Sequence, residues 1–127
     1  MGNHNLSNQN TDEIEGRIEI GRDYYNNFNN KAAKLIFQEG LKIEPSNSRI
    51  KRYLASSRLR LGEFQDALPL LESECVENPF NVGAWESLIE TNMRIGNKSE
   101  VRKIWKSLLN NTWESIEYLM LCLEISL

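Results

Sequence analysis

The fold is decided by residues 45–79, PSNSRIKRYLASSRLRLGEFQDALPLLESECVENP, which run from one proline to the next. Two stretches with apolar residues at helical spacing lie in this segment, and a short break at Gly62 separates them. A unit of two helices with a glycine between them, closed by a proline at an interval of about 34 residues, indicates a helical repeat protein.

The interval between Pro45 and Pro79 recurs at other positions of the chain. Three further sets of residues are spaced by the same 34 positions. They are the small or β-branched residues Ala33, Ala67 and Val101, the large apolar residues Phe37, Leu71 and Trp105, and the glycines Gly62 and Gly96. Agreement of several registers on one period divides the chain into three repeats, at about 14–47, 48–81 and 82–115.

Breaks that contain Gly, Pro or Asn separate the apolar stretches and predict where helices end. The expected helices lie near 13–27, 30–43, 47–61, 64–77, 81–95, 98–110 and 112–126. No segment has the alternation of a strand. The sequence therefore predicts an all-α domain over residues 13–127, an α-solenoid of three helix pairs plus a C-terminal helix. Residues 1–12 have almost nothing to bury and are expected to form a disordered Asn-rich tail.

These residues resemble the tetratricopeptide repeat (TPR) family, whose pattern W-x₂-L-G-x₂-Y…A-x₃-F…P extends over about 34 residues. Residues 14–47 match best, through Ile20-Gly21, Tyr24, Ala33, Phe37 and Pro45. The later repeats depart from the pattern, with Arg58 in place of the aromatic residue and Trp113 in place of the proline. The resemblance implies a right-handed superhelix with a concave groove that receives a peptide or a partner helix.

Composition excludes several classes of function. The net charge is −3 and the pI is near 5.3, which opposes nucleic-acid binding through bulk charge. No signal sequence, no apolar run of membrane-spanning length and no Cys or His cluster with metal-ligand spacing is present. We therefore expect a cytoplasmic protein with reduced thiols, without a cofactor or metal, and without direct contact to membranes or nucleic acids.

Catalysis is not expected either. The only histidine, His4, lies in the polar N-terminal segment, so the fold cannot hold a histidine base beside a nucleophile. No glycine-rich phosphate loop occurs. The sequence predicts a binding protein and not an enzyme.

Helical spacing, combined with the resemblance, predicts which side chains line the groove. The candidates come from the first helix of each pair: Arg22, Tyr25, Arg49, Arg52, Leu59, Arg60, Glu86 and Glu90. Between residues 49 and 60 the second repeat carries four arginines and a lysine without one acid, which favours a partner with an acidic segment. The alternative is a solvated basic face, partly paired with nearby acids.

Chaperone-binding members of the family hold a terminal carboxylate with a clamp of Lys, Asn and Arg side chains. The matching positions in this chain are Ile18, Arg22, Tyr53, Gly83 and Ser87, which do not supply that set. The sequence therefore disfavours a role as a co-chaperone of the cytosolic heat-shock chaperones.

Residues 118–127 are apolar around almost the whole circumference of the expected last helix, whereas a capping helix needs a polar outer face. One interpretation is self-association, as a homodimer, through Leu119, Met120, Leu123 and Leu127. The alternatives are that a further helix of a longer protein covers this surface, or that it packs within the chain.

Two other functions stay open. Residues 85–109 also resemble the half-a-tetratricopeptide repeat of RNA-processing assemblies, although over one repeat only. The chain is alternatively the N-terminal regulatory domain of a larger enzyme. The proline-marked period of the other two repeats favours the protein-interaction scaffold.

Overall fold

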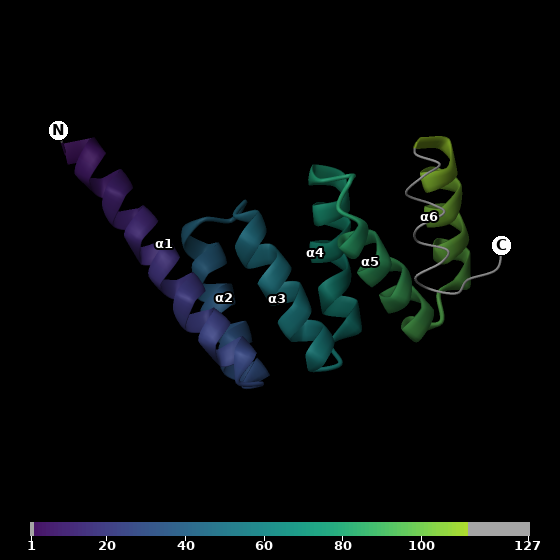
Figure 1. Ribbon diagram of the computed structural model, residues 1–127, viewed down its shortest axis with the longest axis horizontal. Coiled ribbons are helices and arrows are strands. Elements are labelled where there is room, and N and C mark those ends of the chain that lie inside the picture. Colours follow the sequence, from purple (N-terminus) through teal and green to yellow (C-terminus); the bar gives the residue numbers. More distant parts are fainter. Residues whose placement is uncertain (1, 112–127) are drawn as a thin grey trace. The chain divides into compact units, whose positions relative to one another are not determined.

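The computed structural model describes residues 2–111, with side chains described for residues 9–108. This part of the chain contains six helices and no strand, which confirms the all-α prediction. The helices are α1 (Gly2–Asn26), α2 (Asn30–Ile43), α3 (Ser48–Arg60), α4 (Phe64–Glu77), α5 (Val82–Ile95) and α6 (Lys98–Asn111) (Figure 1). The seventh expected helix, 112–126, and the four candidate self-association residues lie outside the described residues.

The N-terminal segment differs from the sequence prediction. A disordered tail was expected over residues 1–12, but α1 begins at Gly2. The described side chains before Ile14 are all exposed, and Ile14 is the first that is buried. The described side chains of the extension, those of residues 9–13, therefore add no packing to hold it. It continues α1 because each added residue of an existing helix gains a backbone hydrogen bond without the cost of a new nucleus.

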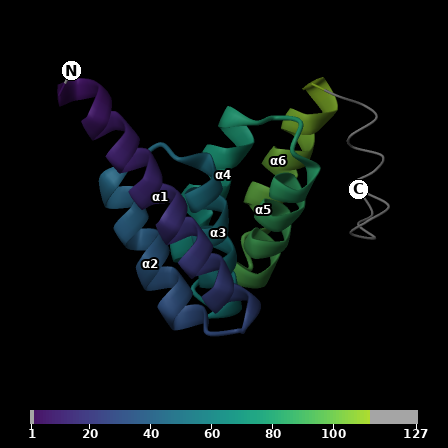
Figure 2. The ribbon, with the colours of Figure 1, turned by 60° about the vertical axis from the view of Figure 1, so that its left-hand side comes forward.

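The chain divides into two compact units, which meet in sequence at Glu63 and Phe64. In the first unit α1 packs on α2, and α2 packs on α3 (Figures 1 and 2). In the second unit α4 packs on α5, and α5 packs on α6. The boundary falls within the second sequence repeat, at the turn that follows α3.

The positions related by the sequence period form the cores of these units. Ala33, Ala67 and Val101 are buried, and so are the large residues Phe37, Leu71 and Trp105. This burial confirms the predicted register.

The close approach of α1 to α2 depends on Gly21. A Cβ atom at Gly21 would lie 2.5 Å from Phe37 Cε1, so no side chain fits there without a shift of the phenyl ring. Glycine is therefore favoured at this position of the family pattern because any larger residue would collide with Phe37.

A residue with a left-handed backbone follows each first helix of a pair. Gly62 has a φ of 76° and Gly96 a φ of 89°, and the equivalent residue of the first repeat is Phe28, with a φ of 60°. In each turn, the backbone amide of the residue after the left-handed position donates a hydrogen bond to the carbonyl oxygen five residues earlier. The three bonds are Asn29 N to Tyr24 O, Glu63 N to Arg58 O and Asn97 N to Asn92 O. This bond is typical of a Schellman motif, which normally places glycine at the left-handed position.

Asparagine side chains begin four of the helices. Those of Asn29, Asn47, Asn81 and Asn97 accept hydrogen bonds from the backbone amides of Ala32, Ile50, Ala84 and Glu100 respectively. Each cap satisfies one amide that has no partner within its helix. Four of the chain's fifteen asparagines thus mark where helices start.

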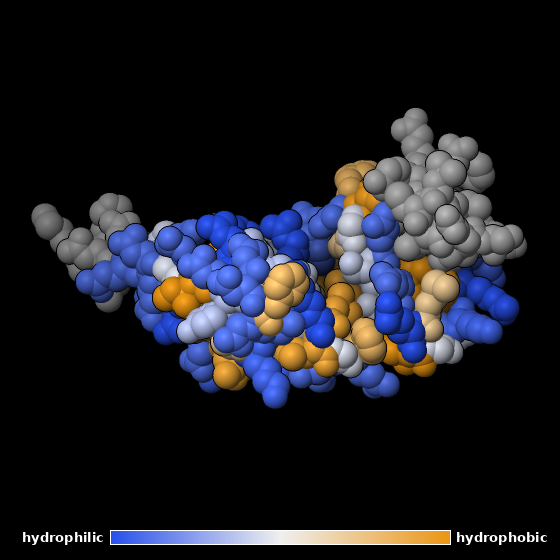
Figure 3. All heavy atoms as spheres, turned by 60° about the horizontal axis from the view of Figure 1, so that its bottom comes forward, coloured by the Kyte–Doolittle hydropathy of each residue, from blue (hydrophilic) through white to orange (hydrophobic). Residues whose placement is uncertain are grey.

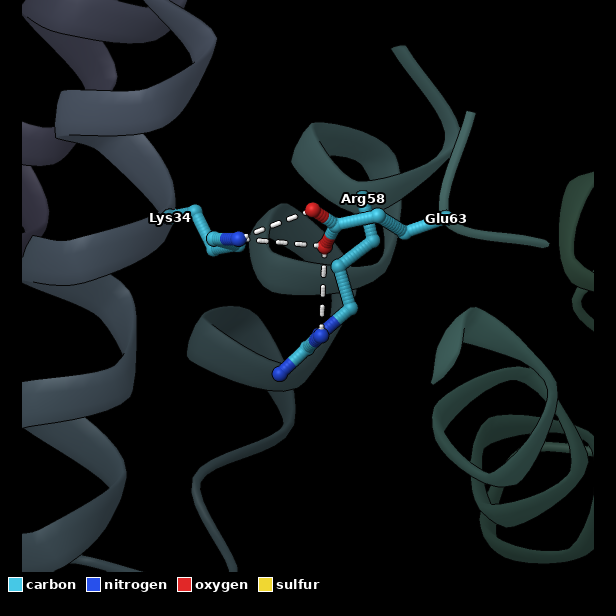
Figure 4. Close-up of polar contacts among 3 residues, drawn as sticks. All are labelled: Lys34, Arg58 and Glu63. Atoms are coloured by element: carbon cyan, nitrogen blue, oxygen red, sulfur yellow. Dashed lines mark hydrogen bonds and ion pairs between the residues drawn. The ribbon is translucent and has the colours of Figure 1, made fainter. Parts of the chain in front are cut away.

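Glu63 stands where Asn29 and Asn97 stand in the other repeats, and its carboxylate joins two cations instead. Lys34 Nζ lies 2.9 Å from Glu63 Oε2, and Arg58 Nη1 lies 3.3 Å from Glu63 Oε1 (Figure 4). All three side chains are half-buried. Arg58, which replaces the aromatic residue of the family pattern, is therefore held by charge in this fold.

Candidate functional site

A hollow of about 230 Å³ opens on the surface of the first unit. Tyr25 of α1 lines it together with four residues of α3, namely Arg49, Arg52, Tyr53 and Ser56. The four positions on α3 follow helical spacing, so one face of that helix supplies them. The structure thus brings together Tyr25, Arg49 and Arg52, three of the residues predicted to bind a peptide.

The hollow has an aromatic wall that is fixed by stacking. The Tyr53 ring stacks on the buried ring of Phe37, with centroids 5.1 Å apart and an interplanar angle of 9°. Tyr25 meets Tyr53 edge to face at 5.9 Å. Sequence reasoning missed Tyr53 as a groove residue, although its place four residues after Arg49 puts it on the same helical face.

Arg49 is not a free cation. Its Nη1 atom lies 3.0 Å from Glu15 Oε1 and 3.3 Å from Glu15 Oε2. Both side chains are exposed, at 45% for Arg49 and 56% for Glu15. An exposed pair of this kind contributes little to stability, so an incoming carboxylate can compete with Glu15 for Arg49.

Arg52 and Arg22 are exposed and form no hydrogen bond or ion pair with any residue that the structure describes. Arg52 belongs to the lining of the hollow, whereas Arg22 does not. The guanidinium of Arg52 is therefore available to a ligand, and it is always charged at physiological pH.

Arg60 does not line the hollow but contacts the end of α1, and its contact with a peptide stays a prediction. Its guanidinium lies 3.4 Å from the centroid of the Tyr25 ring, and its Nη1 donates hydrogen bonds to Tyr25 O at 2.7 Å and Asn30 Oδ1 at 3.5 Å. These contacts tie the end of α3 to the end of α1. Arg60 thus positions Tyr25, while the half-buried Leu59 does not line the hollow.

Glu86 and Glu90 lie on α5 and belong to the second unit, so the hollow of the first unit contains neither. Glu90 Oε1 is 3.4 Å from Arg94 Nη2 one helical turn away. Glu86 is half-buried. Their proposed contact with a peptide stays a prediction.

The described residues offer little else for chemistry. They include no group of three or more His, Cys, Asp or Glu side chains that could hold a metal ion. Burial, together with the nearby carboxylates of Glu74 and Glu72, raises the pKa of the Cys75 thiol to about 12. This thiol is therefore a poor nucleophile at neutral pH. None of the helices described here is long and apolar enough to span a membrane.

The helix pairs, their regular repeat register and the left-handed turn after each first helix define a TPR-type solenoid. Solved structures confirm this fold. The chain matches MamA with a TM-score of 0.70 and 18% identity over 76% of this chain, and it spans 55% of the MamA chain. No protein-family model and no curated protein sequence matches it.

Two further matches are complexes. One is PcrH, a protein of Pseudomonas aeruginosa, with the chaperone-binding region of PopB, at a TM-score of 0.68 and 17% identity over 87% of this chain and 83% of that chain. The other is the first TPR of RPAP3 bound to the HSP90 peptide SRMEEVD, at a TM-score of 0.67 and 18% identity over 90% of this chain and 95% of that chain. At these identities the likeness establishes the fold alone.

Proposed function

We propose that this protein is a non-catalytic interaction scaffold that binds an acidic peptide segment in the hollow of its first unit. One observation carries the proposal. Arg52 presents an exposed guanidinium, without a carboxylate partner among the described residues, beside the edge-to-face pair of Tyr25 and Tyr53. A cation beside a fixed aromatic surface matches a carboxylate-bearing side chain with an apolar stem.

Each lining residue contacts a different part of the ligand in this proposal. Arg52 pairs with the ligand carboxylate, and Arg49 joins it when Glu15 is displaced. The rings of Tyr25 and Tyr53 contact the aliphatic part of the ligand, and the Ser56 hydroxyl can donate or accept a hydrogen bond. Because the arginines are exposed, affinity is modest and falls as salt rises.

The surface of the first unit is consistent with recognition led by charge. On the face drawn in Figure 3, hydrophilic residues cover most of this unit, and apolar residues emerge in separate small groups. Such a face favours a short, polar peptide contact over a broad apolar interface.

Fold neighbours support the class of function. PcrH holds a region of PopB, and the RPAP3 domain holds a peptide with the acidic residues Glu, Glu and Asp. The clamp positions Ile18, Arg22, Tyr53, Gly83 and Ser87 of this chain differ from the chaperone-binding set, so we expect a partner other than a heat-shock chaperone tail. We also propose that the protein is cytoplasmic and that it forms a homodimer.

The test is a selection of random displayed peptides on the intact protein, followed by affinity measurements. The expected result is enrichment of Glu and Asp, and a loss of about threefold to fivefold in affinity for Arg52→Ala, since an exposed ion pair contributes up to about 1 kcal/mol. Arg102→Ala is the matched control, because Arg102 is an exposed arginine on α6 of the second unit. Selected peptides that bind Arg52→Ala as well as wild type would contradict the proposal.

A further inference from the structure

Phe28 occupies a backbone position that the other two repeats give to glycine. Its φ is 60°, against 76° for Gly62 and 89° for Gly96. Among the described residues it is the only non-glycine with a positive φ. A bulky side chain is disfavoured in this conformation, so the phenylalanine costs stability that a glycine would not.

The Phe28 side chain adds little stability that would offset this cost. The residue is 74% exposed, so its ring buries little apolar surface. The turn itself does not need the ring, because the backbone hydrogen bonds of all three turns are alike. A strained and exposed aromatic residue is therefore better explained by recognition than by folding.

Phe28 is connected to the hollow through Arg60. The guanidinium carbon of Arg60 lies 5.0 Å from the Phe28 ring centroid and 3.4 Å from the Tyr25 ring centroid. Tyr25 is also part of the lining of the hollow. Tyr25, Arg60 and Phe28, here called the aromatic shelf, thus extend the site from the cation at Arg52 toward the end of α1.

We propose that Phe28 is a specificity residue, which receives a large apolar side chain of the same peptide whose carboxylate pairs with Arg52. This inference rests on the proposed function and deepens it. The ligand is a segment that combines an acidic residue with a phenylalanine-like residue a few positions away. Arg60 adds a cation to the shelf and so also favours aromatic over aliphatic side chains.

The test uses fluorescein-labelled synthetic peptides and the full chain. Each probe has a Glu-Glu pair in a Gly-Ser background and one Phe placed at successive positions before or after that pair; matched probes carry Ala instead of Phe. We expect one Phe position to bind wild-type protein about fivefold to tenfold more tightly than its Ala counterpart. In Phe28→Gly this preference should disappear, while the affinity for the Ala probe is kept.

Stability provides the second readout. Because glycine relieves the backbone strain, Phe28→Gly should melt at the same temperature as wild type or higher. Phe80→Gly is the control, since Phe80 is similarly exposed in the second unit. That variant should keep the preference for the Phe probe.

The outcomes separate this inference from the proposed function. If Glu-Glu probes bind in an Arg52-dependent way and Phe28→Gly keeps the preference for Phe, the role of Phe28 is wrong and the scaffold function stands. A lowered melting temperature for Phe28→Gly would also overturn it, because the ring would then support the fold. Absence of Arg52-dependent binding by every probe would overturn both.

Discussion

Arg49 and Glu15 are one repeat apart in sequence, and their side chains form an ion pair of 3.0 Å between α3 and α1. The pair occupies the edge of the hollow, where Arg49 is one of two cations. Under the proposed function, Glu15 therefore competes with the carboxylate of an acidic peptide for Arg49.

Removal of that competitor should strengthen binding. In Glu15→Gln the carboxylate is lost and Arg49 becomes available, so the affinity for a Glu-Glu probe should rise about threefold to fivefold at low salt. The gain should shrink at high salt, as measured by fluorescence anisotropy. Glu13→Gln is the control, because Glu13 pairs with Arg17 on the same helix and carries the same charge. An equal gain in both variants would point to net charge and not to Arg49.

Alanine substitutions at two glycines of α1 should change the stability of the protein in opposite directions. Gly21→Ala places a Cβ atom 2.5 Å from the buried Phe37 ring and should destabilise the protein by about 1–3 kcal/mol. Gly16→Ala meets nothing within 4 Å and should stabilise it by about 0.5–1 kcal/mol, because alanine favours the helix interior. Urea unfolding measures both. Equal effects would show that α1 and α2 pack differently.

The triad of Lys34, Arg58 and Glu63 should matter more to stability than an exposed ion pair. Glu63→Gln leaves two half-buried cations without their shared carboxylate, and should lower the free energy of unfolding by about 1–2 kcal/mol. Glu39→Gln, which removes the exposed partner of Lys42, should change it by less than about 0.5 kcal/mol. Comparable losses in the two variants would mean that the triad is as weak as a surface pair.

Cys75 should weaken the fold at alkaline pH. Its pKa is raised from 9.0 to about 12, so between these values the folded state keeps a proton that the unfolded state has released. Stability from this group is fully present below pH 9 and is lost as pH rises toward 12. Cys75→Ala should therefore lose less stability than wild type in urea unfolding as the pH is raised through this range. Identical losses would show that other groups cause the alkaline decline.

Self-association through the C-terminal residues stays a prediction, since they lie beyond the described part of the chain. The double variant Leu119→Glu with Leu123→Glu should sediment as a monomer if that segment forms the dimer seam, because two buried carboxylates would oppose association. Wild-type protein should sediment as a dimer at high concentration. A wild type that remains monomeric at the same concentration would eliminate the homodimer.

The sequence alone determined α2 to α6, their order and their register. Pro45, Pro79 and the matching spacing of Ala33 and Ala67 report local periodicity, which each segment carries by itself. For the same reason the expected bounds of α2 to α6 differ from the observed ones by no more than one residue at either end. The sequence did not predict that α1 begins at Gly2, because residues 1–12 carry no apolar pattern at helical spacing.

Only the tertiary structure decided the contacts of each arginine of α3. Arg49 pairs with Glu15, Arg58 with Glu63, and Arg60 stacks on Tyr25, whereas Arg52 forms no hydrogen bond or ion pair with a described residue. All four lie in one basic stretch and look alike in sequence. Their roles differ because an arginine reaches only the acids and rings that neighbouring helices and turns bring within a few ångströms, and that distance depends on how α1, α2 and α3 pack.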